Sequence, residues 1–136
     1  MSEAKFPVEI LVPDGNVFEG EVEMLSTRTT VGEIGIKANH IPLMATLVPA
    51  ELRLHIDGEI KRFAQGDGYL QVYANHAEVL VEEAVAPQEL DTARLREQIA
   101  EARSRIAAQE KGTAAYAHAE RDKLRWETFL RIAETS

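Results

Sequence analysis

The side chains that could bind a metal are scattered along this chain of 136 residues. Its histidines are His40, His55, His76 and His118, and no two of them are separated by four residues. A zinc site on a helix usually needs two histidines one turn apart, so this spacing argues against a metal centre. The chain also has no cysteine, which excludes thiolate ligands, disulfides and cysteine nucleophiles. We therefore expect no metal site.

The candidates for nucleophilic and acid–base catalysis are also weak. None of the serines occurs in a Gly-x-Ser-x-Gly turn, which would expose a nucleophile. Glu82 and Glu83 are adjacent, and on a strand they would point to opposite faces, so they would not form a catalytic pair. The glycine-rich loops that bind phosphate groups are absent as well. We predict no catalytic residue and no enzyme activity.

The composition is that of an acidic globular protein. Hydrophobic residues make up 45% and charged residues 28%, and the formal net charge is -8. This charge would repel a phosphate backbone, so we expect no nucleic-acid partner. No apolar run approaches the ~20 residues that cross a bilayer, and residues 1–5 resemble neither a signal nor a transit peptide. We expect a soluble protein of a reducing compartment, with any membrane association made through a partner.

Proline and glycine divide the chain into two parts. All five prolines and seven of the eight glycines lie at or before Pro87. Because these residues form turns and interrupt helices, residues 1–87 should be a turn-rich β domain and residues 88–136 a helical domain. The first part carries six basic and fourteen acidic side chains, whereas the second carries nine of each. The whole acidic excess therefore belongs to the first part.

Short alternating segments separated by turn signals predict the β domain. Residues 8–12 are predicted to be a strand that the turn sequence Pro13-Asp14-Gly15-Asn16 ends, and residues 20–24 and 52–56 have the apolar and polar alternation of half-buried strands. Asp57-Gly58 is typical of a hairpin turn, and a second hairpin is predicted around Ala74-Asn75-His76. Many short strands at regular spacing predict an antiparallel β-sandwich in the form of a flattened barrel.

The helical domain is predicted to be an antiparallel two-helix hairpin. The first helix should start at Asp91 and continue to Lys111, before Gly112 ends it. Its apolar stripe is Leu95, Ile99, Ala102 and Ile106. The second helix should cover residues 113–133, with a poorer stripe of Ala117, Leu124, Trp126, Phe129 and Leu130. Because many inward residues are alanine, the seam should be small and the hairpin able to detach.

The most unusual segment runs from residue 32 to residue 43. Gly32-Glu33-Ile34-Gly35-Ile36 is followed, after two residues, by Asn39-His40-Ile41-Pro42-Leu43. One interpretation is a plain strand and turn that Pro42 terminates. The other is that Glu33 and His40 form a polar rim for a protein contact.

This segment resembles the signature of the epsilon subunit of F-type ATP synthase. Residues 12–20 resemble the opening of that family, and residues 66–80 resemble its Gly-aromatic-hydrophobic segment with the following strand. With the two-helix tail, the resemblance covers essentially the whole chain.

The resemblance implies a non-catalytic central-stalk, or rotor, subunit. In that family the β-sandwich grips the gamma subunit and rests on the c-ring, and Glu33 and His40 match the positions of the c-ring contact. The helical tail lies folded on the sandwich or extends along gamma toward the alpha/beta catalytic hexamer, where it blocks ATP hydrolysis. The expected location is the cytoplasmic face of a bacterial cell membrane, with the stromal face of a thylakoid as the alternative.

Some bacterial members of that family bind regulatory ATP in the folded hairpin through a Leu/Ile-Asp-x-x-Arg-Ala motif. Leu90, Asp91 and Arg94 match this motif, whereas Leu95 stands where the motif has alanine. Other arginines could complete a triphosphate cradle, and they are Arg103, Arg121 and Arg125. The alternative is that Asp91 only caps a helix. ATP would be a ligand here, and no cofactor is required.

A different class of function also fits the pattern. The chain could be a free-standing β-sandwich adaptor or sensor whose helical tail binds a partner. Stoichiometric association with a gamma subunit would distinguish the rotor subunit from such an adaptor.

Overall fold

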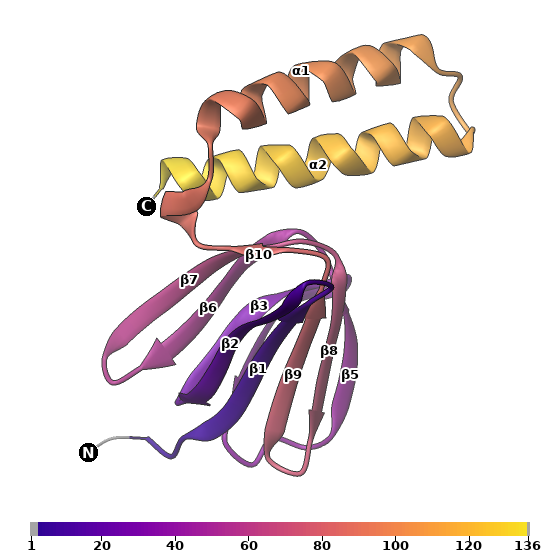
Figure 1. Cartoon of the computed structure of the whole chain (residues 1–136). Coiled ribbons are helices and arrows are strands. Elements are labelled where there is room, and N and C mark those ends of the chain that lie inside the picture. The colour runs from indigo at the N-terminus through magenta and orange to yellow at the C-terminus, as the bar shows by residue number, and fades with distance from the viewer. Residues whose placement is uncertain (1–2, 136) are drawn as a thin grey trace. The chain divides into compact units, whose positions relative to one another are not determined.

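The computed structural model describes residues 3–135, and within them the chain forms ten strands, a short 3₁₀ helix and two α-helices (Figure 1). The chain divides into two compact units, Met1–Ala86 and Pro87–Ser136. The first is a β-sandwich that is nearly closed into a barrel, and the second is a helical hairpin. The predicted fold class is therefore confirmed. Neither helix within the described residues is both long and apolar enough to cross a membrane.

The first unit is a single hydrogen-bonded sheet. Its strands are β1 (Phe6–Val12), β2 (Gly15–Val22), β3 (Met24–Thr29), β4 (Gly32–Lys37), β5 (Leu43–Leu47), β6 (Ala50–Ile56), β7 (Glu59–Gln65), β8 (Gly68–Tyr73), β9 (His76–Val81) and β10 (Ala84–Val85). Their order is β10-β7-β6-β3-β5-β8-β9-β1-β2, with β4 paired to β3. The pairs are antiparallel except β1 with β9, which is parallel. A parallel pair needs a long crossover, so local turn signals could not have predicted it.

Two predicted hairpins are confirmed by their turn geometry. Asp57 and Gly58 join β6 to β7 with φ values of 51° and 82°, and Ala74 and Asn75 join β8 to β9 with φ values of 48° and 60°. Two successive residues with positive φ make a turn whose twist matches that of the flanking strands. These turns set the register of β6–β7 and β8–β9.

The two layers of the sandwich separate along β3. The first half of β3 pairs with β6, whereas Thr29 pairs with Leu47 of β5. A buried polar network lies between these pairings: Thr27 donates to the Gln65 side chain (2.7 Å), and Gln65 donates to the Val48 carbonyl (2.8 Å). Gln65 is completely buried, so these bonds satisfy polar groups that would otherwise be costly to bury.

Two expectations for the β unit need correction. Residues 20–24 are not one strand, because Glu23 separates β2 from β3 and its backbone N–H donates to the His55 carbonyl (2.8 Å). Glu82 and Glu83 are not on a strand either, since they lie in the bend between β9 and β10. The argument that a strand directs their side chains to opposite faces was therefore wrong.

The second unit contains the 3₁₀ helix η1 (Pro87–Glu89) and the antiparallel helices α1 (Thr92–Ala108) and α2 (Ala114–Glu134), as Figure 1 shows. Asp91 and Thr113 cap the N-termini of α1 and α2. The predicted end of the first helix at Lys111 was wrong. The chain leaves the helix after Ala108 because Gln109 is extended, and Gly112, with φ of 86°, lies in the connecting loop.

The apolar stripe of α1 is confirmed at three of its four residues, with Ile106 half-buried, whereas that of α2 is confirmed at Phe129 but wrong at Ala117 and Leu124. Leu95, Ile99 and Ala102 are buried in α1. In α2 the buried residues are Ala119, Thr128, Phe129 and Ile132, whereas Ala117 is exposed and Leu124 is 55% exposed. The inward face of α2 contains Asp122, which pairs with Arg105 of α1. The prediction from apolar residues misplaced part of the inward face of α2, because the carboxylate of Asp122 occupies one of its positions.

Candidate functional site

Exposed apolar side chains gather on one face of the sandwich, formed by β5 and β8. Met44 is 66% exposed, Tyr69 is 55% exposed and Tyr73 is 47% exposed. Tyr69 and Tyr73 alternate with buried residues of β8, and Met44 stands directly opposite Gln71 between them. These side chains therefore point outward on the same side. We call these three side chains the β5–β8 face.

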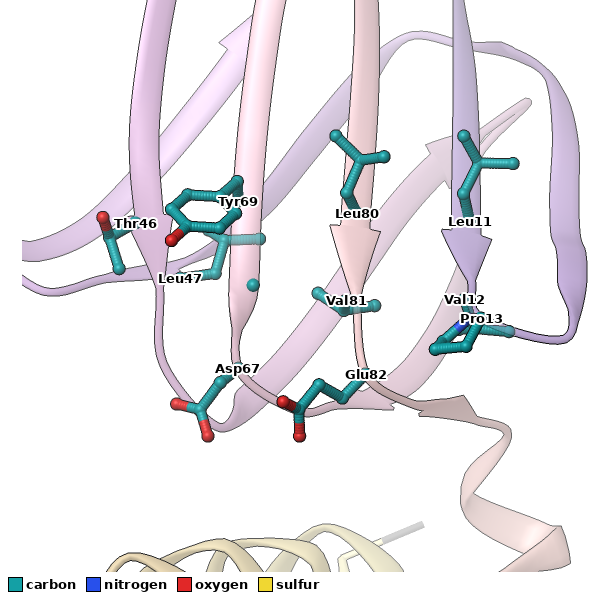
Figure 2. Close-up of a pocket in the computed structure, with 11 residues that line it drawn as sticks. Leu11, Val12, Pro13, Thr46, Leu47, Asp67, Tyr69, Leu80, Val81 and Glu82 are labelled. Atoms are coloured by element: carbon teal, nitrogen blue, oxygen red, sulfur yellow. The ribbon is translucent and has the colours of Figure 1, made fainter.

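A hollow of about 490 Å³ lies at one end of this face (Figure 2). Leu11, Leu80 and Tyr69 line it from neighbouring strands, and the carboxylates of Asp67 and Glu82 lie at its margin. A second hollow, of about 450 Å³, lies at the other end, where Pro42, Met44 and Tyr73 contribute to its wall. The β5–β8 face is therefore apolar, aromatic and hollowed, with negative charge at one margin.

The orientation of Tyr73 is determined by its neighbours. Its hydroxyl donates to Glu78 Oε1 (2.7 Å), and its ring stacks on that of His76 at 5.6 Å between centroids. The hydrogen bond to Glu78 raises the pKa of Tyr73, so the hydroxyl stays protonated and continues to donate. His76 Nε2 in turn lies 3.2 Å from Glu9 Oε1. This cluster holds the aromatic ring in place on the exposed face.

Glu33 and His40 lie at opposite ends of β4. Glu33 is next to the β3–β4 turn and pairs with Arg28 at 3.4 Å, while the adjacent Val31 is 95% exposed at the tip of that turn. His40 follows the other end of the strand, which is roughly 13 Å from Glu33 at about 3.3 Å per residue. The two predicted residues are therefore separated by about the length of β4. Within the described residues β4 pairs with β3 alone, so its other edge is open.

The residues of the predicted ATP motif lie at the start of α1. Leu90 follows η1, and Asp91 is the N-cap of α1. The backbone N–H of Arg94 donates to Asp91 Oδ1 (3.1 Å), while the Arg94 side chain is exposed. The capping role of Asp91 is thus confirmed. A capping carboxylate and an exposed arginine at this end are both accessible to a ligand.

The other predicted arginines are distributed over the two helices. Arg121 is exposed, Arg103 pairs with Glu127 (3.0 Å), and Arg125 pairs with Asp122 (3.2 Å) and lies over the Trp126 ring (4.0 Å). A hollow of about 510 Å³ between α1 and α2 is lined by Arg96, Ile99, Arg103, Glu127, Leu130, Arg131 and Glu134. Of the six predicted ATP contacts, all in the described part of the chain, Arg103 alone lines this hollow. Sequence reasoning missed Arg96 and Arg131, although both are cations at helical spacing from the inward stripe.

Comparison with known proteins decides the family. The family model for the β-sandwich domain of the ATP synthase delta/epsilon chain matches residues 5–87. The ATP synthase epsilon chain of Shouchella clausii is 36% identical over 106 residues, which cover 78% of this chain and 80% of that protein. The epsilon chain of Persephonella marina is 39% identical over 106 residues, 77% of this chain and 78% of that protein. The chain belongs to the ATP synthase epsilon family.

Solved structures confirm the fold of this epsilon-family chain. A chain of the Euglena gracilis mitochondrial ATP synthase, in a structure of the OSCP/F1/c-ring assembly, superposes with a TM-score of 0.79 at 22% identity, covering 94% of this chain and 81% of that chain. A chain of the Tetrahymena thermophila central stalk and c-ring has a TM-score of 0.59 at 17% identity, with coverage of 99% and 98%. Together with the family model and the curated relatives, this confirms the resemblance of the sequence to the epsilon subunit.

Proposed function

We propose that this chain couples the gamma subunit to the c-ring in the central stalk and that the β5–β8 face is the contact with gamma. The observation that supports this most directly is the exposure of Met44, Tyr69 and Tyr73 on one face. Contiguous exposed apolar surface is unusual on a monomer and marks interaction sites. Tyrosine is also enriched at protein interfaces, because its ring buries apolar area while its hydroxyl stays hydrogen-bonded.

We propose further that the c-ring contact runs along the open edge of β4. Glu33 and His40 lie at the two ends of this strand, so a contact that includes both must follow its length. The exposed Val31 would supply apolar area beside Glu33. A cationic or hydrogen-bonding loop of the c-ring fits Glu33, which otherwise pairs with the exposed Arg28 at 3.4 Å.

The helical hairpin is proposed to regulate ATP hydrolysis. In this proposal it is folded in one state and, in the other, extends along gamma to the alpha/beta hexamer. Regulatory ATP would bind the folded state at the Leu90–Arg94 motif and the arginines of the hairpin, and would thereby shift the balance between states. The hollow that contains Arg103 supports this proposal, because arginine gives bidentate contacts to phosphate and Ile99 offers an apolar wall.

The proposed location follows from the assembly. The chain would lie at the cytoplasmic face of a bacterial cell membrane, held there through gamma and the c-ring. The stromal face of a thylakoid is the alternative.

The experiment for the gamma contact is Met44→Glu, measured by titration calorimetry with purified gamma subunit. A charge at the centre of an apolar interface should weaken binding at least about tenfold, since burying an unpaired carboxylate costs more than 1.4 kcal/mol. The matched control is Ile60→Glu, an exposed apolar residue of β7, which should leave the affinity unchanged. Equal effects of the two variants would contradict the assignment of the face. Absence of binding by the unaltered chain would favour the adaptor function instead.

The ATP proposal is tested by titrating the unaltered chain with ATP. Binding should release or absorb heat at millimolar ATP, and Arg103→Gln should weaken it by about tenfold through loss of a charged hydrogen bond. Lys111→Gln, an exposed cation in the loop between the helices, is the control for net charge. No heat from the unaltered chain would exclude regulatory ATP binding.

A further inference from the structure

Within the described residues, three ion pairs of the same polarity join the helices of the hairpin. In each the arginine is on α1 and the carboxylate is on α2: Arg96–Glu134 (2.9 Å), Arg103–Glu127 (3.0 Å) and Arg105–Asp122 (2.7 Å). The first two pairs keep one antiparallel register, because moving seven residues forward on α1 corresponds to seven residues back on α2. Salt weakens all three pairs, and it weakens the more exposed ones most.

Apolar packing is concentrated at one end of the hairpin. The buried residues of α1, which the structure describes in full, are Leu95, Ile99 and Ala102, all within its first eleven positions. In α2, also described in full, Ala119 is the one buried residue before Thr128. We call residues 103–123 the distal half of the hairpin. Besides Ala119, the described residues of this half contribute only half-buried apolar side chains such as Ile106 and Tyr116, so its hydrophobic stabilisation is small and ion pairs can decide whether it stays closed.

Asp122 lies at the inner end of this distal half, next to the apolar end of the hairpin. Its side chain is 16% exposed and faces Arg105 Nη2 at 2.7 Å, Arg125 Nη2 at 3.2 Å and His118 Nε2 at 3.5 Å. The other two interhelical pairs are much more exposed, and exposed ion pairs contribute little to stability. A partly buried carboxylate that bridges two helices is screened less, and removing its charge weakens the contacts that both Arg105 and Arg125 make with it.

We infer that Asp122 is an electrostatic latch that holds the distal half of the hairpin closed. When this latch is weakened, the helices separate first at the loop between residues 108 and 114, while the apolar end of the hairpin stays packed. This inference concerns the stability of the hairpin itself. It therefore stands or fails independently of whether the hairpin inhibits ATP hydrolysis.

The test is native-state amide hydrogen exchange on the full chain. Asp122→Asn keeps the shape of the side chain but removes its charge, and it should accelerate exchange in residues 103–123 by about tenfold. Exchange in residues 92–99 and in the β-sandwich should stay unchanged, which also shows that the variant is folded. Glu120→Gln, an exposed carboxylate on the same turn of α2, is the matched control and should have no effect.

Two further measurements make the latch falsifiable. Arg105→Gln should reproduce the effect of Asp122→Asn. The double variant should add little to either single variant, because both substitutions remove the same interaction.

Raising the salt concentration from about 0.1 M to about 1 M shortens the Debye length from about 10 Å to about 3 Å, so exchange of the distal half should also accelerate in the unaltered chain. Uniform acceleration along the whole hairpin, or the same effect from Glu120→Gln, would overturn the inference.

Discussion

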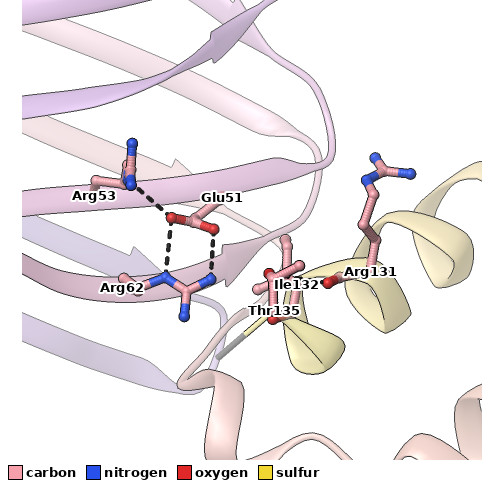
Figure 3. Close-up of polar contacts among 6 residues, drawn as sticks. All are labelled: Glu51, Arg53, Arg62, Arg131, Ile132 and Thr135. Atoms are coloured by element: carbon pink, nitrogen blue, oxygen red, sulfur yellow. Dashed lines mark hydrogen bonds and ion pairs between the residues drawn. The ribbon is translucent and has the colours of Figure 1, made fainter.

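Arg53 and Arg62 stand directly opposite each other on β6 and β7, and Glu51 lies between their guanidinium groups (Figure 3). Glu51 accepts hydrogen bonds from Arg62 Nε (3.0 Å) and Nη2 (2.7 Å), and its Oε1 lies 2.9 Å from Arg53 Nε. Like charges in direct cross-strand positions destabilise a sheet, so this carboxylate neutralises a local repulsion. Hydrogen bonding from Arg62 lowers the pKa of Glu51 below its ordinary value of 4.5, although partial burial opposes the shift.

At the residue scale we predict that Glu51→Gln destabilises the chain at pH 7 by about 1–2 kcal/mol, the net value of a charged hydrogen bond. A lowered pKa in the folded state means that the carboxylate stabilises the fold above its unfolded pKa. That contribution is lost as the pH falls through the folded pKa. The difference between the variant and the unaltered chain should therefore be full at pH 7 and shrink below the ordinary value of 4.5.

Urea unfolding followed by circular dichroism, at pH 7 and again below the ordinary carboxyl pKa of 4.5, measures this difference in stability. Glu59→Gln, on the exposed part of β7, controls for loss of one carboxylate and should change stability by less than about 0.5 kcal/mol. If Glu51→Gln lowers the free energy of unfolding equally at low and neutral pH, the negative charge of Glu51 is not what stabilises the fold.

At the scale of elements, the local chemistry of the chain predicted the turns and helix starts well. Asp57-Gly58 and Ala74-Asn75 form the expected hairpins, because positive φ values at two adjacent residues are a local property. The helix start at Asp91 was correct for the same reason, since a cap bonds within three residues of itself. The end of α1 and part of the inward face of α2 were predicted wrongly because they depend on what the opposite helix offers.

We predict that Asp91→Ala destabilises α1 by about 1 kcal/mol, because the N–H of Arg94 loses its acceptor. Asp91→Asn should have a much smaller effect, since asparagine is about as good an N-cap as aspartate. Amide exchange in the first turn of α1 distinguishes the two variants. Equal acceleration in both would mean that the negative charge of Asp91 near the helix N-terminus, and not the cap, stabilises the helix.

At the scale of the whole molecule, the net charge of -8 has a defined location. The six basic and fourteen acidic side chains of residues 1–87 account for all of it, whereas residues 88–136 carry nine of each. The two units therefore have different electrostatic properties. An acidic sandwich attracts cationic loops of a partner within about one Debye length, and a neutral hairpin with many arginines can still hold a small phosphate ligand.

We predict that Glu33→Lys weakens coupling between ATP hydrolysis and proton movement. A cation at the open edge of β4 would repel a cationic c-ring loop, and a charge at an interface rim is worth roughly 1 kcal/mol, or about fivefold in affinity. ATP-driven proton pumping by vesicles with the assembled complex measures the effect. Glu19→Lys makes the same charge change on β2 and should leave pumping unaltered. Unchanged pumping with Glu33→Lys would remove Glu33 from the c-ring contact.

The sequence alone determined the division near Pro87, the turns, the helix caps and the family signature of residues 32–43, because each depends on residues close together in the chain. Only the tertiary structure decided that β1 and β9 are parallel, that Met44 and Tyr73 share an exposed face, and that Asp122 belongs to the helix seam. The physical reason is that these features bring distant residues together. Whether a side chain is then exposed, paired or buried depends on the residue that packs against it, which no local pattern specifies.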